Sequence, residues 1–93
     1  MVIGLLQLEV FVPGAQSLKD RRSVVKSVKE QLRGRFNVAT AELDPSEAWQ
    51  RATLGIVTIG EDRGYVEGLL RQVTEWVRGT RLVELSRIET EYL

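Results

Sequence analysis

The sequence predicts a single α+β domain in which strands and helices follow in the order β-α-β-β-α-β. Two segments show apolar residues at helical spacing, and four shorter segments alternate or are apolar on both faces. Glycine, proline or capping residues separate these segments. The chain has 93 residues, of which 43% are hydrophobic, and this suffices for one small core. We therefore expect residues 1–93 to form one domain.

The first strand is expected at residues 2–12, where apolar side chains alternate with others. Pro13 ends it, because proline cannot donate a hydrogen bond to a sheet ladder. One face of this strand is apolar throughout, so it suits a core. The other face is mixed, and it consists of Ile3, Leu5, Gln7, Glu9 and Phe11.

The first helix is expected at residues 18–33. Ser17 can cap its free N–H groups, and Asp20, three residues further on, completes a capping-box-like pair. Gly34 is the expected end of the helix, since glycine is common just beyond the last helical turn. The apolar stripe of this helix is formed by Leu18, Val25, Val28 and Leu32.

The second and third strands are expected at residues 36–43 and 50–59, on either side of a turn that begins at Asp44. Both faces of the segment 50–59 are largely apolar, which is typical of a strand buried on both sides. This strand should therefore be central in the sheet. A second helix follows, capped by Asp62 and ended by Gly79, and then a last strand at residues 82–92 with a bulge near Ser86.

Two crossovers around one hairpin give the split βαβ arrangement of a ferredoxin-like fold. It has a four-stranded antiparallel sheet, with the first and third strands central and two helices on one face. The other face is open, and its apolar side chains would form a patch of the kind that marks a contact surface. We therefore expect a homodimer through the open sheet face, with long polar side chains covering that face as the alternative. The expected interface residues are Leu5, Gln7, Phe11, Trp49 and Arg51.

The charges are unevenly distributed, although Lys+Arg and Asp+Glu balance at 13 each. Residues 17–36 hold seven basic and two acidic side chains, so this segment carries +5 and the remainder −5. At about 100° per residue, five cations fall on one side of the first helix. We call this set the basic ridge, and it consists of Lys19, Arg22, Lys26, Lys29 and Arg33.

Cations at this spacing repel one another, so an anionic partner such as RNA phosphate would stabilise the basic ridge. The alternative is a solvated helix face whose charges are balanced by acidic residues elsewhere in the fold. Arg21 lies in the apolar stripe rather than on the ridge, and we expect it to pair with a carboxylate from another strand.

Base stacking on the sheet face, as in RNA-recognition-motif domains, is not expected. Those domains stack bases on aromatic side chains of the two central strands. The segment 51–58 has no aromatic residue, and Glu9 on the first strand repels phosphate. Any RNA contact should therefore use the helix, through backbone charge and shape.

Several short segments occur in a distinctive order, namely Ser17-Leu18-Lys19-Asp20-Arg21-Arg22 before a basic helix, Phe36-Asn37-Val38, Trp49-Gln50-Arg51-Ala52, and Leu54-Gly55. In this order and spacing they resemble the YlxP-like family of uncharacterised bacterial proteins, over nearly the whole chain. The resemblance implies a ferredoxin-like fold. It also implies a role near the ribosome, because members are encoded beside translation-initiation and ribosome-maturation genes. It implies no catalytic residues. Asp20 departs from the glutamate usual there, but both residues can cap a helix.

These observations predict a non-enzymatic accessory protein that contacts RNA or a ribosomal particle through the basic ridge. The alternative is a protein-interaction or structural homodimer without nucleic-acid contact. Its surfaces would be the sheet face and a small polar patch made by Trp49, Gln50, Arg51 and Glu42. The third possibility is an enzyme of the dimeric α+β barrel type, with a pocket between stacked sheets.

Composition argues against several other classes of protein. The chain has no Cys and no His, which removes thiolate chemistry and the commonest general base and metal ligand. Glu42, Asp44 and Glu47 lie close together in sequence but match no calcium loop, so we expect neither a metal nor a cofactor. No apolar run reaches about 18 residues and no signal peptide is evident. We therefore expect a cytoplasmic protein without membrane contact.

Overall fold

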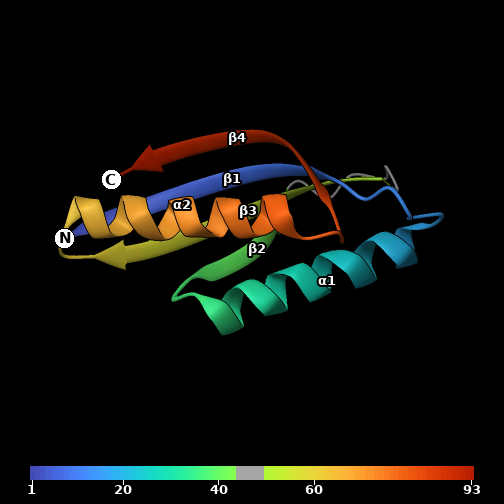
Figure 1. Ribbon diagram of the computed structural model, residues 1–93, viewed down its shortest axis with the longest axis horizontal. Helices are drawn as coiled ribbons and strands as arrows, with labels where there is room; N and C mark the ends of the chain where they lie inside the picture. Colours follow the sequence, from blue (N-terminus) through green and yellow to red (C-terminus); the bar gives the residue numbers. More distant parts are fainter. Residues whose placement is uncertain (44–49) are drawn as a thin grey trace.

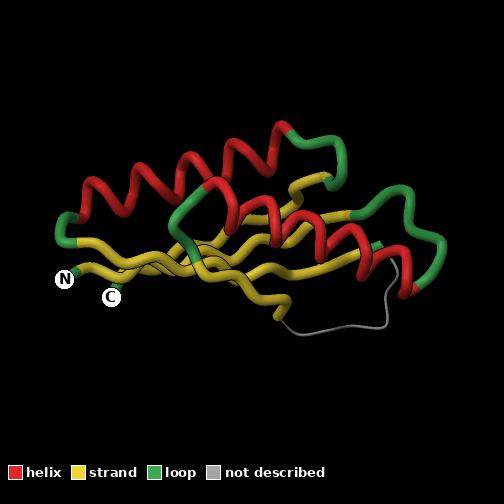
Figure 2. The backbone as a smooth tube through the Cα atoms, turned by 90° about the horizontal axis from the view of Figure 1, so that it is seen from below, coloured by secondary structure: helices red, strands yellow, loops and turns green. Residues whose placement is uncertain are grey.

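The structure, a computed structural model, describes residues 1–43 and 50–93 and confirms the predicted α+β order. Within these residues, the strands form one antiparallel sheet in the order β2-β3-β1-β4, so β1 and β3 are central. Both helices lie on the same side of the sheet (Figures 1 and 2), which is the ferredoxin-like arrangement. The elements are β1 (Val2–Phe11), α1 (Leu18–Arg35), β2 (Ala39–Leu43), β3 (Arg51–Gly60), α2 (Arg63–Gly79) and β4 (Glu84–Tyr92).

The core lies between the sheet and the two helices. Alternate residues of the central strands point toward the helices, and every third or fourth residue of each helix points back. Helix α1 packs over β2 and β3, whereas α2 packs over β1, β3 and β4. The largest fully buried side chains are Leu6, Leu8, Val10, Val12, Val25, Val28, Leu32, Leu54, Ile56, Val66, Val73 and Val77.

Two glycines in the central strands allow close packing on opposite faces of the sheet. A Cβ atom on Gly4 would lie 2.5 Å from a Val66 methyl carbon, so α2 can approach β1 only because this side chain is absent. On the open face, a Cβ atom on Gly55 would lie 2.8 Å from a Leu43 methyl carbon. The Leu43 side chain of the edge strand therefore lies across the middle of β3.

The predicted helix N-caps are confirmed. The Asp20 backbone N–H donates to the Ser17 hydroxyl oxygen at 3.1 Å, and the Asp20 carboxylate accepts from the Gln16 backbone N–H at 3.0 Å. In α2, the Tyr65 backbone N–H donates to the Asp62 carboxylate at 3.0 Å. These bonds fix where each helix leaves its preceding loop, and α2 ends at Gly79 as predicted.

The prediction that Gly34 ends α1 is wrong, because the helix continues to Arg35 and Phe36 forms its C-cap. The Phe36 backbone N–H donates to the Leu32 carbonyl oxygen at 2.9 Å, and the Phe36 ring packs against the core. Residues 36–38 were expected to be strand but form a tight connection instead. The Asn37 carbonyl oxygen in this connection accepts a 2.8 Å hydrogen bond from the buried Thr58 hydroxyl. Strand β2 begins at Ala39.

The predicted bulge at Ser86 is confirmed. Glu9 pairs with Arg87 and Val10 pairs with Leu85, so Ser86 is the extra residue on β4. Its hydroxyl donates to the Glu9 carbonyl oxygen at 3.0 Å. Strand β4 begins at Glu84, two residues later than the expected start at residue 82.

In the described parts of the chain, neither α1 nor α2 combines the length and the apolar character needed to cross a membrane.

Candidate nucleic-acid interface

The basic ridge is a continuous feature of α1. Its members lie about 100° around the helix from the buried stripe, and they extend over about 21 Å of the helix axis. Arg21, Val25, Val28 and Leu32 are the buried residues of this helix. In the ridge, Lys29 is half-buried, and the exposed members are Lys19, Arg22, Lys26 and Arg33.

Two contacts show which flank of the molecule the ridge occupies. Arg35, on the other side of α1, stacks over the Trp76 ring of α2 with 5.3 Å between guanidinium carbon and ring centroid. Arg33, on the ridge, donates to the Thr40 hydroxyl of β2 at 3.0 Å. The ridge therefore faces away from α2 and runs above edge strand β2, where α1 lies in Figure 1.

The ridge cations form no ion pair within residues 1–43 and 50–93. The ion pairs there join Arg21 to Glu42, Arg63 to Glu67, Arg78 to Glu75 and Arg87 to Glu89. The expected alternative, a ridge neutralised by carboxylates of the fold, is therefore not seen among these residues. The ridge therefore carries five positive charges along one flank, four of them on exposed side chains.

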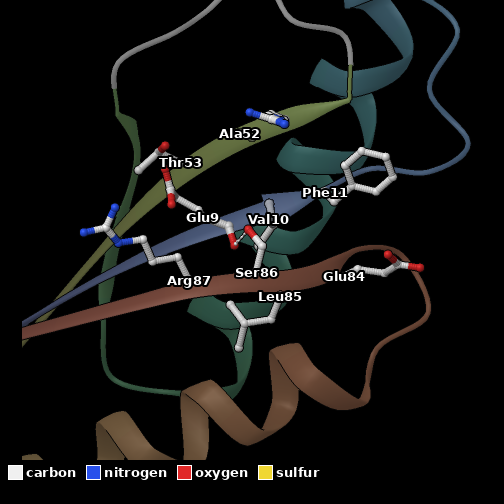
Figure 3. Close-up of a pocket in the computed structure, with 10 residues that line it drawn as sticks. Glu9, Val10, Phe11, Ala52, Thr53, Glu84, Leu85, Ser86 and Arg87 are labelled. Carbon is white, nitrogen blue, oxygen red and sulfur yellow. Dashed lines mark hydrogen bonds between the residues drawn. The ribbon is translucent and has the colours of Figure 1, made fainter.

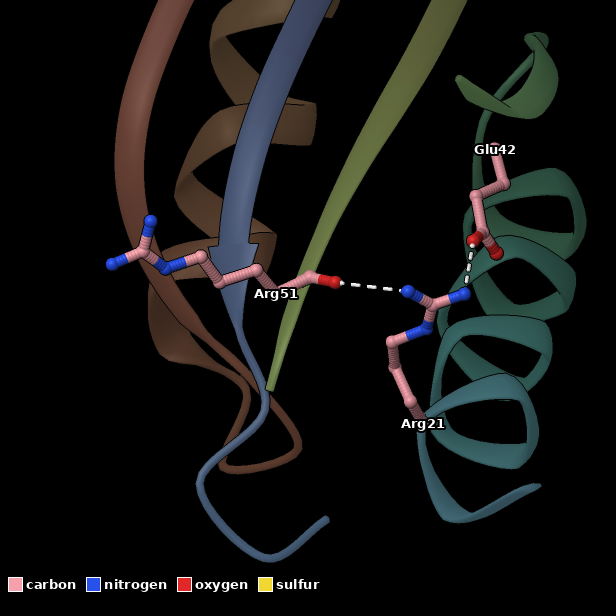
Figure 4. Close-up of polar contacts among 3 residues, drawn as sticks. All are labelled: Arg21, Glu42 and Arg51. Carbon is pink, nitrogen blue, oxygen red and sulfur yellow. Dashed lines mark hydrogen bonds and ion pairs between the residues drawn. The ribbon is translucent and has the colours of Figure 1, made fainter. Parts of the chain in front are cut away.

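Arg21 pairs with a strand carboxylate, as predicted. One guanidinium nitrogen donates to a Glu42 carboxylate oxygen at 3.1 Å, and another donates to the Arg51 carbonyl oxygen at 3.3 Å (Figure 4). The side chains of Arg21 and Glu42 are only 3% and 18% exposed. This pair ties the start of α1 to β2 and β3, so it belongs to the scaffold beneath the ridge.

The prediction that Glu42 joins Trp49, Gln50 and Arg51 in a polar patch is wrong. Glu42 points toward α1, whereas the Arg51 side chain points away from Arg21, as Figure 4 shows. Trp49 lies outside the described residues, as do Asp44 and Glu47 of the carboxylate group weighed for metal binding. Among the described residues, no group of three or more potential ligands could hold a metal ion.

The open sheet face carries an apolar patch, which we define as Ile3, Leu5, Ala39, Leu43, Val57 and Ile59. Register places Ile3 opposite Ile59 and Leu5 opposite Val57, and Ala39 flanks Val57 on the other side. Ile59 is 52% exposed, which is high for a large apolar side chain on a central strand. Of the predicted interface residues, Leu5, Gln7 and Phe11 lie half-buried on this face and Arg51 lies exposed on it.

The opposite edge of the same face is acidic, which sequence reasoning missed. Register places three carboxylates of β4 beside the open face of β1, and with Glu9 they form what we call the acidic edge, namely Glu9, Glu84, Glu89 and Glu91. Arg87 lies among them and pairs with Glu89. The alternation of acids in the last strand was the available signal, but the neighbour of that strand had to be known first.

A hollow of about 550 Å³ opens on this face beside the Ser86 bulge. Figure 3 shows Glu9, Glu84 and Arg87 around it, with Phe11 at one end. These charged side chains are exposed and the hollow is open to solvent. The hollow therefore lies on the sheet face that a second, stacked sheet would cover.

Comparison with known proteins agrees with the resemblance noted in the sequence. Residues 3–90 match the DUF503 family, described as "Protein of unknown function (DUF503)". The chain is 29% identical over 91 residues to the "Uncharacterized protein YlxP" of Bacillus subtilis (strain 168), covering 98% of this chain and 99% of that relative. The match spans every helix and strand of the fold.

Proposed function

We propose a function that follows from the geometry of the basic ridge, for a chain that belongs to the DUF503 family. It is a non-enzymatic accessory protein of the cytoplasm that binds RNA, free or within a ribosomal particle. The single observation that supports this is the ridge of five cations with no ion pair in the described residues. The phosphate backbone of RNA is a cellular polyanion that matches an extended row of positive charge.

The charge distribution of the whole fold favours the same surface. The basic ridge runs above β2 at one edge of the sheet, and the acidic edge follows β4 at the other. Such a molecule approaches a polyanion with its α1 flank and turns its β4 flank away. The order of the strands therefore orients the protein on RNA before any contact forms.

Salt sensitivity tests this proposal. We expect affinity for an RNA oligonucleotide to fall about 100-fold or more between 50 and 200 mM monovalent salt. Five cation–phosphate contacts give a slope of log K against log salt of about −3.5 on a single strand and about −4.5 on a duplex. Fluorescence anisotropy with a labelled RNA of about 20 nucleotides, titrated at several salt concentrations, measures this slope.

Absence of binding at 50 mM salt would contradict the proposal, and so would affinity that does not change with salt. A neutral oligomer with the same bases, such as a peptide nucleic acid, is the matched control. It should not bind, because it keeps the bases but carries no phosphate.

We further propose that the apolar patch of the open sheet face contacts a second copy of the chain. A two-fold dimer places the same surface on both partners, so the apolar patch of one copy meets that of the other. Exposed Ile59 and half-buried Leu5 and Val57 would then leave water. Both helices lie on the far side of the sheet, so each ridge stays accessible in such a dimer (Figure 2).

A charge placed in the apolar patch should prevent this dimer. We expect the double variant Val57→Arg/Leu5→Arg to elute as one chain in size-exclusion chromatography with light scattering, while the wild type elutes as two. Two buried cations facing their own copies across the interface would repel without compensation. Arg71→Glu on α2 is the control and should leave the mass of two chains unchanged. A wild-type mass of one chain at micromolar concentration would contradict this proposal.

A further inference from the structure

We propose that the basic ridge recognises the paired phosphate backbones of a nucleic-acid duplex in preference to a single strand. This inference rests on the RNA binding proposed above and names the form of nucleic acid that the surface fits. Three features of the described residues support it, namely the positions of the aromatic rings, the rigidity and length of the ridge, and the charge of the open sheet face.

Single-strand binding surfaces combine cations with exposed aromatic rings on which bases stack. In residues 1–43 and 50–93, no aromatic ring lies on the ridge. The Trp76 ring on α2 lies beneath the Arg35 guanidinium. The Tyr92 ring on β4 lies beneath the Arg63 guanidinium, with 4.4 Å between guanidinium carbon and ring centroid. Phe36 packs on the core at the end of α1. Tyr65, which is exposed, lies at the start of α2, and Phe11 lies on the open sheet face. Within residues 1–43 and 50–93, unpaired bases therefore find no stacking surface beside these cations.

The ridge is straight and held in place. Helix α1 is fixed to the sheet by the Arg21–Glu42 pair at its first turn and by its buried residues Val25, Val28 and Leu32. Its cations recur every three or four residues, which is about 4.5–6 Å along the axis. A duplex offers an equally regular row of phosphates, whereas a flexible strand must first be ordered to match this spacing.

A duplex also presents more charge to a ridge of this length. Double-stranded DNA carries one negative charge per about 1.7 Å of axis, so the length of duplex alongside the ridge, about 21 Å, carries about twelve phosphates on its two strands. The ridge holds only Lys and Arg, the side chains whose charge neutralises phosphates. Helix α1 packs against the sheet on its buried side, so only its ridge side can lie along or across the phosphate rows of a duplex.

The surface that related topologies use for single strands is unsuitable in this chain. Bases would have to stack on the open face of β1 and β3, which carries the apolar patch and Glu9. Glu84, Glu89 and Glu91 border that face along β4. Their charge repels a phosphate backbone, which leaves the ridge as the surface for nucleic acid.

The experiment compares defined 20-mers at 100 mM salt by fluorescence anisotropy. The single strands are rU20, which is unstructured, and rA20; the duplexes are rA20·rU20 and dA20·dT20. We expect about tenfold tighter binding of the RNA duplex than of rU20, because five contacts release about one more counterion from a duplex than from a strand. The DNA duplex shows whether the sugar matters. An affinity for dA20·dT20 comparable to that for rA20·rU20 supports recognition of paired phosphates.

The outcomes separate this inference from the function on which it rests. Equal or tighter binding of rU20 overturns the duplex preference and leaves RNA binding intact. No binding of any RNA at low salt overturns both. The variant Arg22→Glu/Lys26→Glu/Arg33→Glu should lose the duplex preference together with the affinity. If a duplex preference persists in that variant, the ridge is not its origin and the inference is wrong.

Discussion

Reversing three charges of the basic ridge, as Arg22→Glu/Lys26→Glu/Arg33→Glu, should weaken RNA binding by about 100-fold or more while the fold survives. Three cation–phosphate contacts are lost, and three carboxylates then face the phosphates across the same flank. On the counterion-release scale, three contacts alone correspond to about two to three decades of affinity near 0.1 M salt. The measurement is the equilibrium affinity for a 20-mer RNA, followed by fluorescence anisotropy.

The fold should survive because all three side chains are exposed and take part in no ion pair of the described residues. One hydrogen bond is lost, from Arg33 to Thr40, and it is a surface contact. Surface substitutions of this kind usually change the free energy of unfolding by less than about 0.5 kcal/mol each. The carboxylate at position 33 lies in the last turn of α1 and opposes the helix dipole, so we expect a small loss of stability. Far-UV circular dichroism shows whether the fold is retained, and thermal melting measures the loss of stability.

A charge-matched variant distinguishes a local surface from a general effect of net charge. Arg71→Glu/Arg78→Glu/Arg81→Glu changes the net charge equally but alters the middle and the end of α2 and the loop after it. Among the ion pairs of the described residues, this variant breaks only the exposed Arg78–Glu75 pair, which costs little. This variant should keep RNA affinity within about threefold of the wild type at 200 mM salt, where distant charges are screened. Equal losses in both variants would show that overall charge, and not the ridge, governs binding.

Most of the fold could be predicted from the sequence because local signals and long-range pairing agree. Ser17 and Asp62 mark helix starts through hydrogen bonds within three residues, so no tertiary information is needed. The irregular alternation in the last strand was sufficient to place a bulge at Ser86. The errors occur where tertiary packing decides. Helix α1 passes through Gly34 because Phe36 packs on the core and supplies the cap instead.

The candidate site was predictable to a similar extent. Helical periodicity alone places the ridge on one side of α1 and Arg21 among the buried residues, as the structure confirms. Periodicity cannot say which neighbour each side faces, since that depends on strand order. The acidic edge and the partner of Arg21 both depend on register between segments far apart in the chain. For the same reason, the proposed patch of Arg51 with Glu42 failed, because adjacent strands can present two nearby residues on opposite faces.

Breaking the buried pair through Arg21→Met should lower the free energy of unfolding by about 3 kcal/mol. Methionine fills much of the space but leaves the Glu42 carboxylate, 18% exposed, without its cation and removes a donor from the Arg51 carbonyl oxygen. Removing one partner of a buried ion pair typically costs about 3–5 kcal/mol, and the partial exposure of Glu42 places this case at the lower end. For a chain of this size, the melting temperature should fall by more than about 10 °C.

The double variant Arg21→Met/Glu42→Leu tests whether the cost comes from the abandoned carboxylate. Replacing both charges with apolar side chains removes the uncompensated group, so we expect it to recover about 2 kcal/mol or more relative to Arg21→Met. Arg78→Met breaks a pair whose side chains are 53% and 68% exposed, and it should change stability by less than about 0.5 kcal/mol. Urea denaturation monitored by tryptophan fluorescence gives all four free energies. If Arg21→Met is no less stable than Arg78→Met, the pair does not hold α1 on the sheet, and the ridge loses the rigid base on which its duplex preference depends.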